Sequence, residues 1–150
     1  MLIVVAIIGI IVAISVANLI NAVQRAKQKR SMGDMRTLAL AVESYSTDVN
    51  RYPSAAGFVL PSGLSLPTAT LEALALQLTP TYIRTVPMTD GWNSWFTYAT
   101  SSSQTDYAIR SNGADGSSES APPFGATHLF EADIILVDGA FVQYPEGTQK

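Results

Sequence analysis

The sequence predicts an α+β protein in which one long N-terminal helix packs against a small antiparallel β-sheet. Three observations support this fold class: an uncharged apolar run over residues 1–24, a helical apolar stripe that continues it, and a change to a period of two near residue 95. We therefore expect three parts: a membrane or filament-core helix over 1–24, an amphipathic continuation over 25–52, and a C-terminal globular domain over 53–150.

Residues 1–24 contain no charged side chain, and the first charge is Arg25. At about 1.5 Å per residue, a helix of this length reaches roughly 36 Å and crosses a hydrocarbon layer of about 30 Å. A core helix of a small soluble domain would show a polar face, which Ser15, Asn18 and Asn21 do not form. A signal peptide carries basic residues before its apolar part, whereas here they follow it. The run therefore predicts a membrane-inserted helix.

Residues 25–52 are predicted to continue the same helix. Apolar residues recur at spacings of three and four, which places them on one helix face: Met35, Leu38, Val42, Tyr45 and Val49. Pro53 disfavours helix at the residue before it and so marks the end. Because this half is amphipathic, we expect the sheet to pack on its apolar stripe.

The domain over 53–150 begins with an irregular connection, residues 54–69, in which proline and glycine act as breakers. Thr70 is a suitable N-cap for a short helix that runs to Thr79, and Pro80 ends it. Residues 82–88 are expected to be extended or irregular, and Asp90-Gly91 marks a turn.

Four short aromatic or β-branched segments with a period of two are predicted to be strands: 95–99, 106–110, 133–137 and 140–144. Asp138-Gly139 suits a two-residue type I′ hairpin, in which both central residues have positive φ. The loop over 111–129 is long for a compact domain, so we expect it to be functional or mobile.

Charge is divided unevenly along the chain. Residues 1–36 hold five basic residues and one acidic residue, a net charge of +4, whereas residues 37–150 hold four and eleven, a net of −7; together these give −3. A basic cluster after an apolar helix is typical of the cytoplasmic side of a membrane. It can also lie against lipid headgroups or pair with acids of a neighbouring copy. The acidic remainder predicts no nucleic-acid partner.

Residues for catalysis are scarce. The chain has one histidine, His128, no cysteine, no G-x-S-x-G, no phosphate loop and no G-x-G-x-x-G. Paired carboxylates such as Asp90 and Asp106 are most simply interpreted as surface acids. The sequence therefore predicts a protein that is not an enzyme.

The apolar stretch LIVVAIIGIIVAISVANL resembles the N-terminal helix of type IV pilins and of type II secretion pseudopilins. Later motifs are similar to those of the major pseudopilin: Glu43-Ser44-Tyr45, residues 48–53, residues 78–83, Pro87 with Asp90-Gly91-Trp92-Asn93, and Tyr107–Ser111 with Gly113–Gly116. The similarity covers most of residues 2–116 and fades over 117–150. The chain is thereby identified as a member of the pilin-like superfamily.

This resemblance implies a structural subunit that polymerises through its N-terminal helix into a helical pseudopilus. The expected filament-interface residues are Leu2, Val5, Ile8, Ile11, Arg25, Arg30 and Asp34. The charged ones have a second interpretation, a solvated helix flank with i,i+4 pairs such as Arg30–Asp34. The implied partners are copies of the chain, inner-membrane assembly machinery, minor pseudopilins and, before assembly, membrane lipid. The implied location is the inner membrane as a single-pass protein, then a periplasmic or extracellular filament.

In the family, a basic leader, a cleavage site, a methylated N-terminal residue and a Glu precede the apolar run, and this chain begins inside that pattern. The Glu neutralises the N-terminal amine of the adjacent subunit. We therefore expect a chain starting at Met1 to assemble poorly unless upstream residues exist in the native protein. The alternatives are a type IV pilin that forms a surface fibre for adhesion, motility or electron transfer, and a periplasmic binding module with a single membrane anchor.

The loop after residue 111 is a candidate Ca²⁺ site. Calcium takes about six to eight oxygen ligands, including backbone carbonyls, and a glycine-rich turn presents carbonyls beside a carboxylate. The resemblance implies the carbonyls of Asn112 and Ser117 and the carboxylate of Asp115 as ligands, with a second carboxylate from Asp133 or Glu119. The alternative is an Asx-type turn in a solvated loop.

Overall fold

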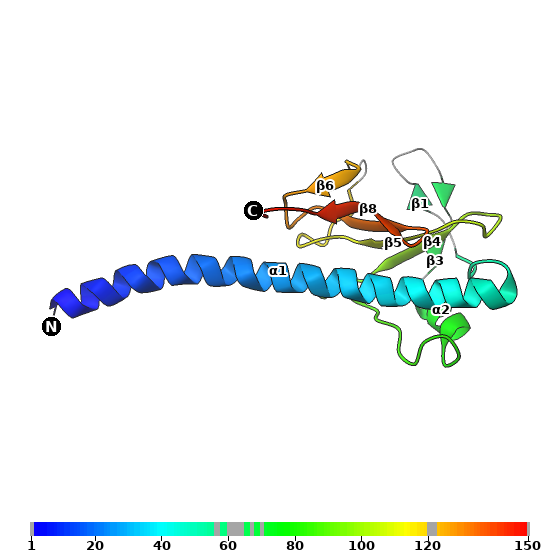
Figure 1. Cartoon of the computed structure of the whole chain (residues 1–150), viewed down its shortest axis with the longest axis horizontal. Helices are drawn as coiled ribbons and strands as arrows, with labels where there is room; N and C mark the ends of the chain where they lie inside the picture. The colour runs from blue at the N-terminus through cyan, green and yellow to red at the C-terminus, as the bar shows by residue number, and fades with distance from the viewer. Residues whose placement is uncertain are drawn as a thin grey trace.

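The computed structural model of the chain describes residues 2–55, 58–59, 65–66, 68–69, 71–119 and 123–149. One helix, α1 (Leu2–Val49), runs along the whole molecule. The sheet lies against its C-terminal half, while its N-terminal half projects beyond the globular domain (Figure 1). The predicted α+β class is confirmed.

Helix α1 ends where the sequence predicts, within a few residues. Asn50 adopts a left-handed φ of 59° and donates its N–H to the Ser46 carbonyl at 2.8 Å, which closes the last turn. The predicted apolar stripe faces the domain: Met35, Leu38 and Val42 are fully buried. The stripe therefore supplies the helix side of the core.

A second helix, α2 (Leu71–Leu78), buries the leucines of one face, Leu71, Leu74 and Leu78, and contacts α1. The short helix predicted here is confirmed. Its expected N-cap, Thr70, lies outside the described residues, as does much of the connection over 54–69.

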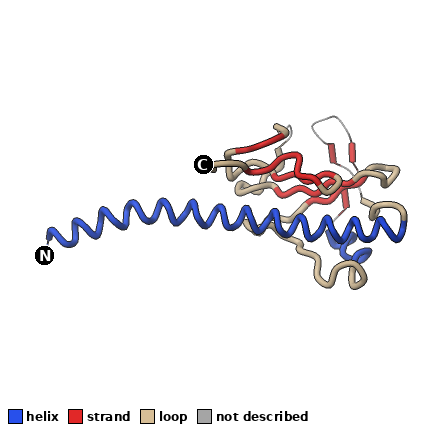
Figure 2. Tube along the Cα trace, viewed as in Figure 1, coloured by secondary structure: helices blue, strands red, loops and turns tan. Residues whose placement is uncertain are grey.

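The main sheet has the strand order β3-β4-β5-β7-β8-β6. Its strands, drawn in red in Figure 2, are β3 (Thr68–Ala69), β4 (Thr97–Thr100), β5 (Tyr107–Ser111), β6 (Gly125–Thr127), β7 (Ile134–Val137) and β8 (Ala140–Pro145). A separate two-stranded sheet pairs β1 (Phe58–Val59) with β2 (Ser65–Leu66). The four predicted strands correspond to β4, β5, β7 and β8.

The sheet is mixed, which corrects the expectation of a wholly antiparallel one. Strand β6 forms within the predicted loop over 111–129. It lies at the edge of the sheet beyond β8, with which it pairs in parallel. The β7–β8 hairpin is as predicted, because Asp138 and Gly139 have φ of 46° and 79°, the positive values that a type I′ turn requires.

The core lies between the stripe on α1 and one face of the sheet. Tyr98, Tyr107, Ile109 and Leu136 from β4, β5 and β7 are fully buried and pack in the same cluster as Met35 and its neighbours. The expectation that the sheet packs on the amphipathic half of α1 is confirmed, and the apolar half is left without a partner in the domain.

Candidate functional site

The N-terminal half of α1 exposes its apolar side chains on all sides. Leu2, Val5, Ile8 and Ile11, the expected filament-interface residues of this half, are 88%, 67%, 54% and 58% exposed. The helix is long and apolar enough to cross a membrane, and none of its apolar span is buried inside the molecule. Continuous apolar surface of this extent marks a site that lipid or protein covers.

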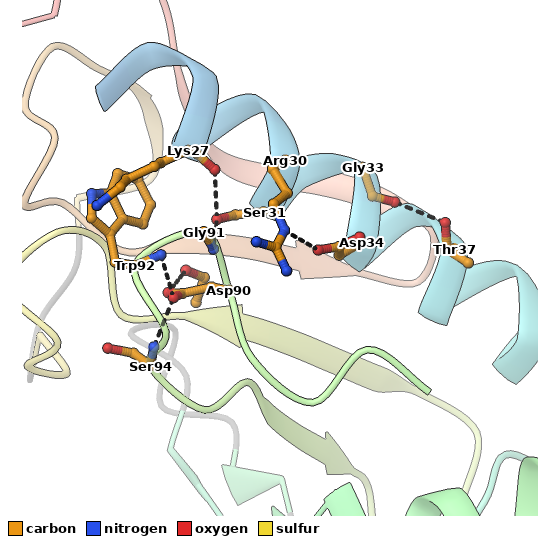
Figure 3. A network of polar contacts seen from close by, with 11 residues as sticks. Lys27, Arg30, Ser31, Gly33, Asp34, Thr37, Asp90, Gly91, Trp92 and Ser94 are labelled. Atoms are coloured by element: carbon orange, nitrogen blue, oxygen red, sulfur yellow. Dashed lines mark hydrogen bonds and ion pairs between the residues drawn. The ribbon is translucent and has the colours of Figure 1, made fainter. Parts of the chain in front are cut away.

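The apolar half emerges from the domain at a clamp made by the loop after residue 88, which we call the Asp90 loop (residues 89–95). Ser31 on α1 donates to the Lys27 carbonyl at 3.0 Å and accepts the Gly91 N–H at 2.9 Å (Figure 3). About two turns earlier, Trp92 Nε1 donates to Gln24 Oε1 at 2.6 Å. The bonds to Gln24 and Ser31 attach α1 to the domain from the end of the apolar run to about two turns beyond it.

Asp90 organises this loop from inside the protein. Its side chain is 1% exposed, and Oδ1 accepts the N–H groups of Trp92 and Ser94, each at 2.9 Å. Its Oδ2 accepts the hydroxyl of Ser111 at 2.7 Å. The interpretation of Asp90 as a surface acid is wrong, because the carboxylate is buried and takes two donors from the turn and a third from β5.

The other candidates for acid–base chemistry do not gather around Asp90. Asp106 precedes β5, at the opposite end of that strand from Ser111, and accepts a hydrogen bond from Thr105 at 2.6 Å. The His128 ring is exposed, with Nδ1 2.7 Å from the Glu146 carbonyl oxygen. Within the described part of the chain, the His128 ring makes no hydrogen bond to a hydroxyl or a carboxylate, so the histidine forms no catalytic pair with these residues.

The expected charged contacts of the filament interface lie just beyond the apolar half. Arg30 Nε lies 3.4 Å from Asp34 Oδ2, the i,i+4 pair that the spacing allows. Both side chains are partly exposed, so the pair contributes little to stability. Arg25 is exposed and lies on a different side of α1, beside the C-terminal tail.

The candidate calcium residues lie where β5 ends and β7 begins. The register pairs Ser111 with Ile134, so Asn112 and Asp133 follow as neighbours across the two strands. Asp133 is fully buried; its Oδ2 accepts the Glu119 N–H at 3.1 Å and lies 3.9 Å from Arg110 Nη1. The structure thus brings together the Asn112, Asp133 and Glu119 that the sequence proposed.

The turn over 112–117 closes through its own polar groups. Asp115 Oδ1 accepts the Ser117 N–H at 3.0 Å, which is an Asx turn, and the Asn112 amide donates to the Gly116 carbonyl at 3.2 Å. Asp115 and Ser117 are exposed on this turn. A Cβ on Gly113 would collide with the carbonyls of Glu131 and Ala132, so the turn lies directly on the segment before β7.

Gln143 on β8 completes this cluster, and sequence reasoning missed it. It is fully buried, and its Nε2 donates to Glu119 Oε2 at 3.1 Å. The only sequence signal was a polar residue within a short alternating strand. Counting only partners among the described residues, three side chains of this cluster keep a buried oxygen without a hydrogen bond: Asn112 Oδ1, Asp133 Oδ1 and Gln143 Oε1.

Burial dominates the electrostatics of the cluster. Burial raises the pKa of Asp133 to about 6, even though the Glu119 N–H and the Arg110 charge oppose that rise; the charges of Glu119 and Asp115 add to it. Among the described residues, no three His, Cys, Asp or Glu side chains are grouped to hold a metal. The oxygens without hydrogen-bond partners in this cluster are therefore mainly amide oxygens, with one carboxylate oxygen from Asp133.

Comparison with known proteins gives one finding. The family model described as type II secretion system (T2SS), protein G, matches residues 18–123. This span is more than half of the 150 residues and includes the Asp90 loop and the turn over 112–117, but it ends before β6. No curated protein and no solved structure gives a significant match.

Proposed function

Because the chain belongs to the family of type II secretion system protein G, we propose that it polymerises through its N-terminal helix into a pseudopilus filament. Membership of this family makes it a structural pseudopilin and not an enzyme.

The observation that carries the proposal is the exposed apolar half of α1. Removing one large aliphatic side chain from water is worth about 1.5–3 kcal/mol. This half presents many such side chains, from Leu2 at 88% to Val23 at 47% exposure. Lipid covers such a surface, and so do the helices of other copies. A subunit can therefore leave the membrane for a filament without exposing apolar surface to water.

The geometry of the chain suits an open polymer. The apolar half projects from one end of the globular domain and shows apolar side chains on all sides (Figure 1). Head-to-tail packing of such helices repeats one heterologous contact without closing, which generates a helical filament with the domains outside. Leu2, Val5, Ile8 and Ile11 would form the filament core, and Arg25, Arg30 and Asp34 would lie at its edge.

We place the subunit first in the inner membrane as a single-pass protein and then in a periplasmic filament. Its partners would be copies of itself, the inner-membrane assembly machinery and minor pseudopilins. The family match favours a pseudopilus over a surface type IV pilus, whose helix is similar.

Electron microscopy of sheared fractions tests the assembly. The gene, with its upstream codons, is expressed in cells that carry a type II secretion system, and fibres are labelled with antibody against the globular domain. We expect short labelled fibres for the wild type and none for Ile11→Asp. Leu40→Asp is the matched control, because Leu40 lies on α1 beside the domain and is 69% exposed.

Membrane insertion is measured in the same cells by alkaline extraction. A wild-type chain that inserts but forms no fibre would contradict the proposal and indicate an anchored binding module. Long surface fibres would contradict the pseudopilus and indicate a type IV pilus.

We also propose that the cluster around Asp133 binds Ca²⁺. The three unpaired buried oxygens of Asn112, Asp133 and Gln143 support this, together with the acidic side chains of Glu119 and Asp115. Carbonyls of the turn, including those of Asn112 and Ser117, would complete the oxygen ligands that calcium takes. A bound Ca²⁺ would hold the turn over 112–117 to Asp133 at the start of β7, because both would be ligands of the same ion.

Thermal unfolding of the full chain in detergent tests the calcium site. Calcium at about 100 times its Kd is expected to stabilise the wild type by about 2.7 kcal/mol relative to EDTA, and magnesium much less. Asp115→Asn, which keeps an acceptor for the Ser117 N–H, should weaken calcium binding at least tenfold. Asp106→Asn in a different loop is the control. A wild type with equal stability in calcium and EDTA would contradict the site.

A further inference from the structure

A cavity of about 280 Å³ lies between α1 and the C-terminal tail, and its lining includes no residue of the clamp or of the Asp133 cluster. We call it the basic pocket. Its lining comes from one face of α1 and from the segment after β8: Arg25, Gln28, Lys29, Met32, Pro145, Gly147 and Gln149. The tail ends beside α1 just past the apolar half, as Figure 1 shows.

The wall of the pocket is built from buried side chains. Gln149 is 4% exposed and its Nε2 donates to the carbonyls of Thr127 and Glu146, each at 2.8 Å. Its Oε1 accepts from Nε2 of Gln28, which is 5% exposed, at 3.4 Å. These bonds hold Gln149 of the tail against α1 and thereby form one wall of the cavity.

The chemistry of the lining selects an anion. Arg25 and Lys29 are exposed and, within the described part of the chain, neither has an ion-pair partner, whereas Arg30 is paired with Asp34. The lining contains no acidic side chain. The Gln28 amide uses one N–H for Gln149 and keeps a second one. Guanidinium, ammonium and amide donors together match the oxygens of a phosphate group.

The position along α1 identifies the source of the phosphate. Arg25 is the first charged residue after the apolar half, so inserting that half into a bilayer brings the pocket to the level of the headgroups. The volume is at the lower end for small-ligand sites, about 300 Å³, which suits a headgroup without its acyl chains.

We propose that the basic pocket binds the phosphate headgroup of an anionic phospholipid while the subunit is held in the membrane. This rests on the membrane insertion proposed above and goes beyond polymerisation. The site assigns a role to Arg25 and Lys29 before assembly, and it requires the C-terminal tail, which lies outside the matched part of the family model.

Native mass spectrometry of the full chain in neutral detergent tests the proposal. The protein is titrated with short-chain phosphatidylglycerol, short-chain phosphatidylcholine and glycerol phosphate. We expect phosphatidylglycerol to bind at least tenfold more tightly than either of the others. Glycerol phosphate binding as tightly as the lipid would indicate a free phosphate compound as the ligand and overturn the lipid source.

Two double variants of equal charge locate the binding. Arg25→Gln with Lys29→Gln removes both cations that line the pocket and should weaken phosphatidylglycerol binding by more than tenfold, because the phosphate then loses its two charged donors. Lys27→Gln with Arg30→Gln removes two cations from the same segment that do not line the pocket, and should leave binding within about threefold.

Equal losses in the two double variants would show that the basic segment attracts lipid diffusely, and would overturn the pocket. Circular dichroism checks that both variants keep their fold. If instead an acidic group of a neighbouring copy occupies the pocket, the wild type shows no lipid preference while Arg25→Gln with Lys29→Gln abolishes fibres. Alkaline extraction reports insertion separately, so a failure of the pocket is distinguishable from a failure of the membrane location.

Discussion

Tyr98 and Tyr107 are adjacent core residues with different hydrogen bonding. Both are fully buried, and their rings stack with centroids 6.3 Å apart. The Tyr98 hydroxyl donates to the Pro53 carbonyl at 3.1 Å, whereas the Tyr107 hydroxyl lies near the Glu43 carboxylate and makes no close hydrogen bond within the described part of the chain. Burial raises the pKa of both phenols well above 10, and for Tyr107 the charge of Glu43 adds to that rise.

These two tyrosines predict opposite effects of one substitution. Tyr107→Phe removes a buried hydroxyl that makes no close hydrogen bond and is expected to stabilise the domain by up to about 1 kcal/mol. Tyr98→Phe leaves the Pro53 carbonyl without its donor and should cost about 1 kcal/mol. Chemical denaturation of the full chain in detergent at neutral pH measures both. A loss of stability in Tyr107→Phe equal to that in Tyr98→Phe would contradict the hydrogen-bond assignment.

Alkaline pH supplies the control for this pair. A phenol whose folded pKa exceeds its unfolded value stabilises the fold fully below pH about 10, and that contribution is lost as the pH rises further. Each Phe variant removes one such group. Both variants should therefore lose stability less steeply than the wild type above pH 10. At neutral pH, by contrast, the two substitutions change the stability in opposite directions.

At the level of single residues, the sequence predicted the candidate cation site in part. Asp115 was proposed because a glycine-rich turn presents carbonyls beside a carboxylate, and Asp133 was proposed because the family resemblance implies a second carboxylate. Gln143 was missed because a lone glutamine in a strand has no local signal, and its role depends on β8 lying beside Glu119. Asp90 was misjudged for the same reason: its burial depends on Ser111 and on α1, both distant in sequence.

Among the elements, the contact between the Asp90 loop and α1 depends on the absence of one side chain. A Cβ on Gly91 would collide with the backbone of Lys27. Gly91→Ala is therefore expected to cost about 1–3 kcal/mol, because the loop must move away and the Gly91 N–H loses Ser31. The matched control is Gly33→Ala, on an exposed position of α1 with nothing within 4 Å of the added carbon.

Gly33→Ala should stabilise α1 by about 0.5–1 kcal/mol, since glycine is a poor helix former. Chemical denaturation of the two variants side by side measures the difference. A destabilisation of less than 0.5 kcal/mol for Gly91→Ala would show that the clamp is loose.

Elements with a strong local pattern were predicted well. The stripe from Met35 to Val49 and the Asp138-Gly139 turn each carry a periodicity or a dihedral requirement that needs no tertiary information. Strand β6 was not predicted, because Gly125-Ala126-Thr127 has neither alternation nor β-branched enrichment. Its register comes from Gln143, Tyr144 and Pro145 on β8, so tertiary pairing decides it.

For the whole molecule, an uneven division of hydrophobicity and charge along the chain predicted the architecture. The apolar half of α1 lies outside the domain, the amphipathic half lies inside it, and the sheet follows from the change of period. The basic pocket was beyond sequence reasoning. Arg25 and Lys29 are visible as a cluster, but the tail that encloses the space returns from 121 residues away, as the Gln28–Gln149 contact shows.

That separation has a consequence for synthesis. A ribosome releases the apolar half of α1 first, long before Gln149 has been translated, so the helix can enter a bilayer while the domain is still unfinished. The contact between Gln28 and Gln149 can form only after Gln149 has been translated, 121 residues later. A chain cut short before Gln149 would keep the apolar half of α1 but lack one wall of the basic pocket. The pocket is therefore completed later in synthesis than the apolar half.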